Sequence, residues 1–65
     1  MRLTVNGQAL EAQATTLAAL LEELELPARR CATALNSEFV PRGQREATPL
    51  KDGDRIEILT PMQGG

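Results

Sequence analysis

Residues 15–27 read TTLAALLEELELP, and this stretch decides the fold because it predicts the element that supplies most of the core. Its leucines recur with the spacing of one face of an amphipathic helix, at Leu17, Leu20, Leu21 and Leu24. Thr15 or Thr16 can cap the start of the helix, and Pro27 prevents the helix from continuing. The glutamates fall largely off this stripe, at Glu22, Glu23 and Glu25. We therefore expect one helix with buried leucines and a solvated acidic face.

A β-hairpin is predicted before the helix. In residues 1–5 apolar and polar side chains alternate, which is the period of a half-buried strand. The pair Asn6-Gly7 follows, and it favours a tight turn because both central positions of such a turn need positive φ. A second strand over residues 8–12 is then expected to pair back antiparallel.

A second hairpin is predicted after the helix. The stretch that starts at Arg29 reads as a strand, and its small residues Ala32 and Ala34 suit a strand that is covered by a helix. An Asn36-Ser37 turn then leads to a short strand, which carries Phe39 and Val40.

The last third of the chain predicts a connection and a final strand. Residues 42–49 are polar and irregular, so we expect them to form a surface connection. A turn over residues 52–54 then leads to a strand in which Ile56 and Ile58 point inward.

This order of elements predicts an α+β fold in which one helix packs on a mixed sheet of four to five strands. The first and last strands can lie side by side in such a fold, and the last strand then leads to the chain end. We therefore expect one domain over residues 1–60 and a flexible tail over residues 61–65, which ends in Gly-Gly.

Composition narrows the function. The net charge of −2 and the aromatic content of 2% argue against nucleic-acid binding, and no apolar run is long enough to span a membrane. Without a readable signal peptide, we expect a cytoplasmic protein. The chain has no histidine and one cysteine, so the usual zinc ligands and an internal disulfide are missing. No catalytic triad or glycine-rich phosphate loop is found either, so the sequence does not predict an enzyme.

Several segments together resemble the bacterial thiazole-biosynthesis sulfur carriers, which are β-grasp (ubiquitin-like) proteins. They are TVNG (4–7), TLAALLEEL (16–24), ALN (34–36), FVPR (39–42), LKDGDRIEI (50–58) and the terminal GG. The resemblance covers essentially the whole chain, in order and at compatible spacing. Two residues depart from this resemblance. Cys31 stands where relatives more often carry an aliphatic residue, and Pro61 stands just before the tail.

The resemblance implies a chemistry for the last residue. In this family an E1-like adenylating enzyme uses ATP to convert the terminal carboxylate into an acyl-adenylate. Sulfur from a persulfide then displaces AMP and leaves a thiocarboxylate, which here falls on Gly65. Thiazole synthase receives that sulfur. The carrier itself then needs no bound cofactor and no metal, and a monomer when free is the simplest expectation.

The tail residues suit this chemistry. A terminus that enters a narrow channel of another protein is best made of glycine, because Gly64 and Gly65 have no β-carbon that would widen the strand or restrict its dihedrals. Met62 and Gln63 are expected to contact partner enzymes or to serve as a spacer. Pro61 reads as a strand terminator, because it cannot donate a hydrogen bond to a sheet.

A docking patch is predicted on the sheet face away from the helix. Leu59 falls on the outer face of the last strand, and with Phe39 or Val40 it could form an apolar surface for partners. Cys31 lies in an apolar segment, and free cysteines are mostly buried, so a structural role is expected for it rather than a role in sulfur relay.

Three alternatives remain at this point. A molybdenum-cofactor sulfur carrier shares the fold, the tail and the activation chemistry. A ubiquitin-like protein modifier would use the same tail, although a single lysine, Lys51, makes self-linked chains a poor prospect. A plain interaction module would carry the glycine pair without using it.

Overall fold

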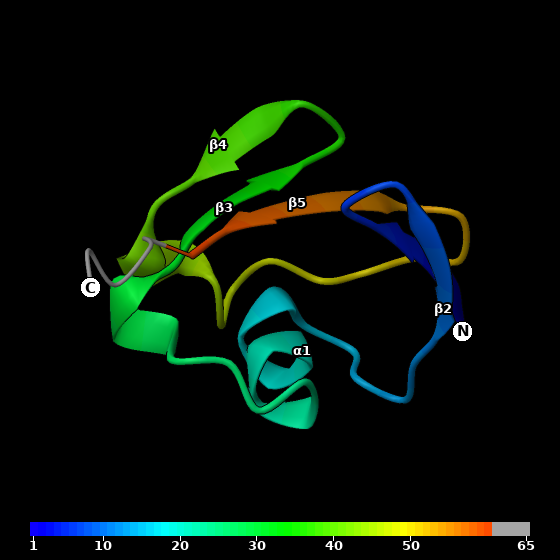
Figure 1. The fold of residues 1–65 in the computed structure, drawn as a ribbon, viewed down its shortest axis with the longest axis horizontal. Helices are drawn as coiled ribbons and strands as arrows, with labels where there is room; N and C mark the ends of the chain where they lie inside the picture. The colour runs from blue at the N-terminus through cyan, green and yellow to red at the C-terminus, as the bar shows by residue number, and fades with distance from the viewer. Residues whose placement is uncertain (61–65) are drawn as a thin grey trace.

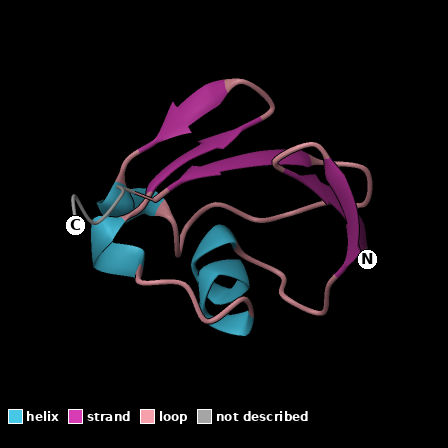
Figure 2. Ribbon diagram, viewed as in Figure 1, coloured by secondary structure: helices cyan, strands magenta, loops and turns pink. Residues whose placement is uncertain are grey.

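The computed structural model describes residues 1–60, which form a mixed sheet with one α-helix on one face (Figures 1 and 2). The strands are β1 (Arg2–Val5), β2 (Gln8–Glu11), β3 (Ala32–Leu35), β4 (Glu38–Val40) and β5 (Arg55–Leu59). The helix is α1 (Leu17–Glu23), and two short 3-10 turns are η1 (Ala28–Arg30) and η2 (Arg42–Gln44). Within the described chain, no helix is long and apolar enough to cross a bilayer.

The sheet has five strands in the order β2-β1-β5-β3-β4. The last strand, β5, is therefore the central one, and it lies parallel to β1 and antiparallel to β3. This arrangement confirms the predicted α+β fold with a mixed sheet, and it confirms that the first and last strands are neighbours. β5 therefore ends inside the sheet at Leu59, and Thr60 and residues 61–65 follow it in the sequence.

The leucine stripe of α1 forms the centre of the core. Leu17, Leu20 and Leu21 are completely buried, and they pack with Leu3, Ile56 and Ile58 from the sheet. Leu24 is only partly buried, so three of the four predicted leucines are fully enclosed. Thr16 is the N-cap, and its side chain accepts a hydrogen bond from the Ala19 backbone N–H at 3.1 Å.

The helix is shorter than the run up to Pro27 would allow. It ends at Glu23, with Leu24 as the C-cap, and Glu25 has a φ of 58°, which breaks the helical path. After Pro27 the chain forms η1, and the first residue of β3 is Ala32. The prediction that the strand begins near Arg29 was wrong, because proline starts a 3-10 turn that carries the chain from α1 to the sheet.

Both predicted hairpin turns are confirmed. The central residues of each turn have positive φ, with values of 50° and 83° at Asn6 and Gly7 and of 50° and 74° at Asn36 and Ser37. These are the left-handed conformations that two-residue hairpin turns require, and asparagine adopts them more readily than most residues.

The expectation that residues 42–49 form only a surface connection was wrong for Arg45. Its side chain is 3% exposed, and the segment around it lies against α1. The backbone N–H of Leu17 donates to the Thr48 carbonyl at 3.0 Å, and that of Ala18 donates to the Arg45 carbonyl at 3.2 Å. The connection therefore crosses the start of the helix and is part of the packed structure.

Candidate functional site

The candidate site is built around the end of β5. Leu59 is the last residue of this strand, and Thr60 is the last residue that the structure describes. The predicted tail, which begins at Pro61, lies outside the described residues, and so do its candidate site residues Met62, Gln63, Gly64 and Gly65. The described part of the site is therefore the strand end and the sheet surface beside it.

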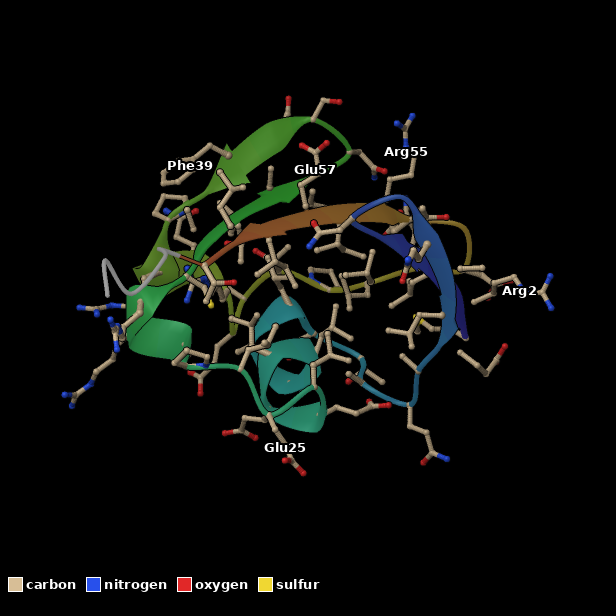
Figure 3. All side chains as sticks on the ribbon, viewed as in Figure 1. Arg2, Glu25, Phe39, Arg55 and Glu57 are labelled. Carbon is tan, nitrogen blue, oxygen red and sulfur yellow. The ribbon has the colours of Figure 1, made fainter. Side chains whose placement is uncertain are left out.

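That surface is the sheet face away from α1. In Figure 3, Phe39, Arg55 and Glu57 project from this face, whereas Glu25 lies on the far side of the helix. Phe39 is 69% exposed and Leu59 is 72% exposed, and they are the large apolar side chains left in solvent within residues 1–60. The two residues that the sequence singled out as a docking patch thus share one open face.

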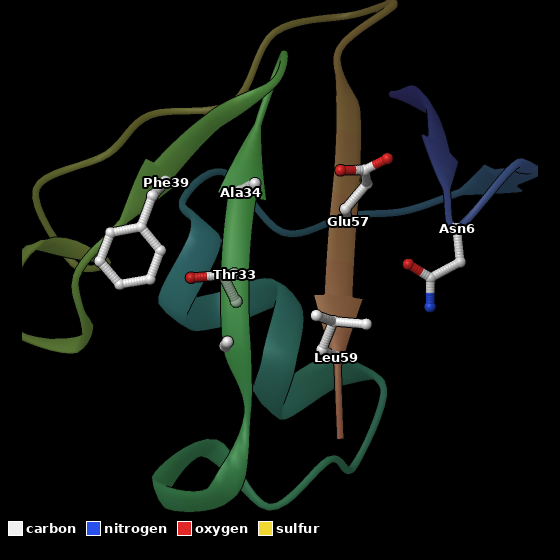
Figure 4. Close-up of a pocket in the computed structure, with 7 residues that line it drawn as sticks. Asn6, Thr33, Ala34, Phe39, Glu57 and Leu59 are labelled. Carbon is white, nitrogen blue, oxygen red and sulfur yellow. The ribbon is translucent and has the colours of Figure 1, made fainter. Parts of the chain in front are cut away.

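A shallow groove of about 430 Å³ runs between them (Figure 4). Its lining consists of Asn6, Ala32, Thr33, Ala34, Phe39, Glu57 and Leu59. The strand register explains its shape, because Ala34 is paired with Phe39 on one side and Ala32 with Leu59 on the other. Two alanines on β3 leave a low floor between a phenylalanine on β4 and a leucine on β5.

The orientation of β3 is the reverse of the predicted one. The small residues Ala32 and Ala34 were expected to lie under the helix, but they face the open groove, and Thr33 is the buried residue, with 2% of its side chain exposed. Val40, the other residue proposed for the docking patch, is buried with an exposure of 8%. The apolar patch therefore consists of Phe39 and Leu59 alone.

The end of β5 is held on both sides. On one side β3 pairs with it through Ala32 and Leu59. On the other side β1 has already turned away, and the carboxamide of Asn6 takes its place. The Ile58 N–H donates to Asn6 Oδ1 at 2.8 Å, and Asn6 Nδ2 donates to the Ile58 carbonyl at 3.1 Å. Sequence reasoning identified Asn6 only as a turn residue, because its partner lies 52 positions further along the chain.

The start of β5 is held by a buried carboxylate and a second asparagine. Asp54 is 5% exposed, and its carboxylate accepts hydrogen bonds from the Lys51 backbone N–H at 2.8 Å and from Asn36 Nδ2 at 3.1 Å. Asn36 Oδ1 accepts from the Arg55 N–H at 3.0 Å. The central strand is therefore fixed at both ends by side chains as well as by its neighbours.

A second groove, of about 350 Å³, lies at the end of β5. It is lined by Arg29, Arg30, Cys31, Ala32, Leu59 and Thr60. Cys31 is 8% exposed and forms no disulfide. The carbonyl of this cysteine accepts a hydrogen bond from the buried guanidinium of Arg45, which also bonds Ala28 and Thr33. The backbone beside the thiol is thus fixed by neighbouring elements.

Among residues 1–60, no three histidine, cysteine or acidic side chains are grouped so that they could hold a metal ion. What the described residues offer is a strand end at the centre of a sheet, with an apolar groove on the open face beside it.

Comparison with known proteins adds independent findings. The sequence model of the ThiS family matches residues 3–65. The chain is 35% identical over 66 residues to the sulfur carrier protein ThiS of Escherichia coli (strain K12), and each chain is covered completely. It is also 36% identical over 66 residues to a thiazole synthase of Paramagnetospirillum magneticum, of which it spans 20% of the length. A crystal structure of the thiamine biosynthesis protein ThiS from Geobacter metallireducens matches with a TM-score of 0.85 at 36% identity, with both chains fully covered.

Proposed function

The chain belongs to the ThiS family and is a sulfur carrier of thiamine biosynthesis, not an enzyme, and on that premise we propose that its reactive group is the α-carboxylate of Gly65. The observation that carries this proposal is the position of β5. The strand that leads to residues 61–65 is the central strand of the sheet, and its last residues are held from both sides. The family match extends to residue 65, which supports the same assignment.

The proposed reaction takes place on an E1-like adenylating enzyme. An oxygen of the Gly65 carboxylate attacks the α-phosphate of ATP, and pyrophosphate leaves. The terminal sulfur of a persulfide then attacks the acyl carbon and displaces AMP. A thiol cleaves the remaining sulfur–sulfur bond, so that a thiocarboxylate stays on the glycine. ATP and the persulfide belong to the partner's reaction, and the carrier supplies only the carboxylate.

The carrier itself contributes a chain end that a partner can reach and orient. Gly64 and Gly65 carry no β-carbon, so a narrow channel of the partner can close around their backbone. Capture of an extended chain end by main-chain hydrogen bonds is a common mode of recognition. An ionised thiocarboxylate is the nucleophilic form of the sulfur, as a thiolate is for cysteine.

We further propose that partners dock on the apolar patch of Phe39 and Leu59. Exposed apolar patches that are rimmed by polar residues mark sites of protein interaction. The groove lies beside the end of β5, the strand that leads to residues 61–65, so a partner that covers it would lie at the end of this strand. We propose thiazole synthase as the acceptor of the sulfur, and the similarity to a thiazole synthase of Paramagnetospirillum magneticum supports this choice.

The experiment is intact-mass spectrometry of the carrier after incubation with its adenylating enzyme, ATP, a persulfide donor and a thiol. We expect the exchange of one terminal oxygen for sulfur, located on Gly65 by fragmentation. The matched control is the same chain with an amidated C-terminus, which keeps the fold and removes the carboxylate. Thiazole formation that continues with the amidated chain would refute the proposal.

The same experiment separates the alternatives. A covalent adduct between Gly65 and a lysine of another protein would indicate a modifier. Transfer of the sulfur to a molybdopterin precursor, with none to thiazole synthase, would indicate a molybdenum-cofactor carrier. A chain that is never adenylated would be an interaction module.

A further inference from the structure

We infer that Asn6 is a positioning residue, which sets the direction in which the chain leaves the sheet through its hydrogen bonds to Ile58. This inference rests on the proposed function, because it concerns how the C-terminal segment is presented to a partner. Asn6 lies in the first hairpin turn, far from Gly65 in sequence, and it neither binds a cofactor nor takes part in the chemistry.

The geometry is that of an interrupted parallel ladder. Thr4 and Asn6 donate their backbone N–H groups to the carbonyls of Asp54 and Ile56, at 3.0 and 2.9 Å. If β1 continued, its next backbone groups would pair with both the N–H and the carbonyl of Ile58. The chain turns at Asn6-Gly7 instead, and the Asn6 carboxamide supplies one acceptor and one donor at those two places, at 2.8 and 3.1 Å.

A carboxamide can replace a strand residue here because it carries the same pair of groups as a peptide bond. Aspartate has the acceptor but lacks the donor, and glycine lacks both. In Figure 4 the Asn6 side chain lies beside β5, on the side opposite to β3. Without this side chain, the end of β5 around Ile58 would be paired on the β3 side only.

This position matters because Ile58 is the last residue but one of β5, the strand that leads to residues 61–65. A strand end that is paired on one side frays more readily than one that is paired on both. Fraying lowers the fraction of carriers in which the end of β5 has the direction that the partner binds. The apparent affinity of the partner falls in proportion to that fraction, whereas the chemical step in the bound state does not change.

Asn36 provides a matched control for Asn6 within the same molecule. This residue has the same φ of 50° in the second hairpin turn. Its Oδ1 accepts a hydrogen bond from the N–H of Arg55, the first residue of β5, at 3.0 Å, and its Nδ2 donates to the carboxylate of Asp54, just before the strand, at 3.1 Å. Each asparagine therefore sits in a hairpin turn and accepts one backbone N–H of β5, but Asn36 holds the start of the strand and Asn6 holds its end.

The test compares Asn6→Gly with Asn36→Gly. Glycine keeps the positive φ that each turn needs, so both variants should fold. The assay is adenylate formation, measured as ATP–pyrophosphate exchange with the carrier as the varied substrate. We expect Asn6→Gly to raise the KM for the carrier about tenfold with an unchanged kcat, which is the size of effect expected from losing two such hydrogen bonds. Asn36→Gly should leave both constants near those of the unmodified carrier.

A second variant and a second measurement complete the test. Asn6→Asp keeps the turn but cannot donate to the Ile58 carbonyl, so it should also raise the KM. Hydrogen exchange by NMR should show faster exchange of the Ile58 amide in Asn6→Gly than in Asn36→Gly at equal global stability. An unmodified carrier that is not adenylated would count against the proposed function, and the exchange measurement would still decide the role of Asn6. Equal KM values for the two glycine variants, or equal exchange of Ile58, would overturn the inference.

Discussion

Replacing Arg45 with alanine should destabilise the fold more than any other substitution of a charged residue in the segment after β4. The Arg45 guanidinium is enclosed, with 3% of the side chain exposed, and it donates three hydrogen bonds. Nη1 donates to the Ala28 carbonyl at 2.8 Å, Nε donates to Thr33 Oγ1 at 3.0 Å, and Nη2 donates to the Cys31 carbonyl. One side chain thus links the connection after β4 to η1 and to β3.

The size of the expected destabilisation follows from the three acceptors that would lose their hydrogen-bond donor in Arg45→Ala. Hydrogen bonds to a charged group contribute about 1.5–3 kcal/mol each, and a buried acceptor without a partner costs about 1–3 kcal/mol. The cost of burying the guanidinium offsets part of this, so we expect a net loss of about 3–5 kcal/mol. A chain of 65 residues has a total stability of roughly 3–10 kcal/mol at the usual value per residue. Arg45→Ala should therefore bring the protein close to its unfolding limit.

The assay is urea unfolding at neutral pH, followed by far-UV circular dichroism, because the chain has no tryptophan or tyrosine for a fluorescence signal. Arg42→Ala is the matched control, since Arg42 is exposed in the same segment and should change the stability by less than about 0.5 kcal/mol. Arg45→Met keeps an apolar stem and loses only the donors. If Arg45→Met were as stable as the unmodified protein, the hydrogen bonds would not be the source of the stabilisation and the reasoning above would be wrong.

Three other predictions concern the docking patch, the cysteine and the helix cap. Leu59→Thr and Phe39→Thr should each raise the KM of the adenylating enzyme for the carrier severalfold. Because both side chains are mostly exposed, the stability should change by less than about 0.5 kcal/mol. Ala9→Thr on β2 is the control, and an equal KM for all three variants would exclude the patch. Cys31→Ala should lower the stability by about 1 kcal/mol through lost packing and leave the yield of thiocarboxylate intact, as measured by intact mass; a folded variant that cannot accept sulfur would contradict this. Thr16→Ala should cost about 1 kcal/mol in urea unfolding, through the lost N-cap bond, and a cost near zero would mean that water replaces that bond fully.

The sequence predicted those features that depend on neighbouring residues. The leucine spacing of α1, the alternation along β5 and the asparagine turns are all local patterns, and each appears in the structure where it was expected. The outward position of Leu59 followed from the same alternation, because Ile56 and Ile58 point inward. Since period and turn type are set within a few residues, one sequence was enough for these features.

The features that the sequence missed depend on residues that are distant in the chain. Nothing in the composition of residues 42–49 shows that Arg45 is buried, because its acceptors lie 12 to 17 positions away. The pairing of Asn6 with Ile58 spans 52 positions. The face of β3 was also assigned wrongly, since threonine is the buried residue there and is satisfied by the Val40 carbonyl and by Arg45. A buried hydroxyl is acceptable only when such partners exist, and they become visible only in the folded chain.

Buried and exposed side chains alternate along β5, so the residues that stabilise the core differ from those of the proposed docking patch. Ile56 and Ile58 are buried in the core and Leu59 stands on the opposite face, so a substitution in the proposed docking patch leaves no cavity in the core. Ile58 contributes both to the core and to the position of the strand end, because its side chain is buried and its backbone is hydrogen-bonded to Asn6. A substitution at Ile58 itself would change packing and strand direction together. The contribution of strand direction to sulfur transfer can therefore be isolated only from the Asn6 side of the contact, with Asn36 as the reference for stability.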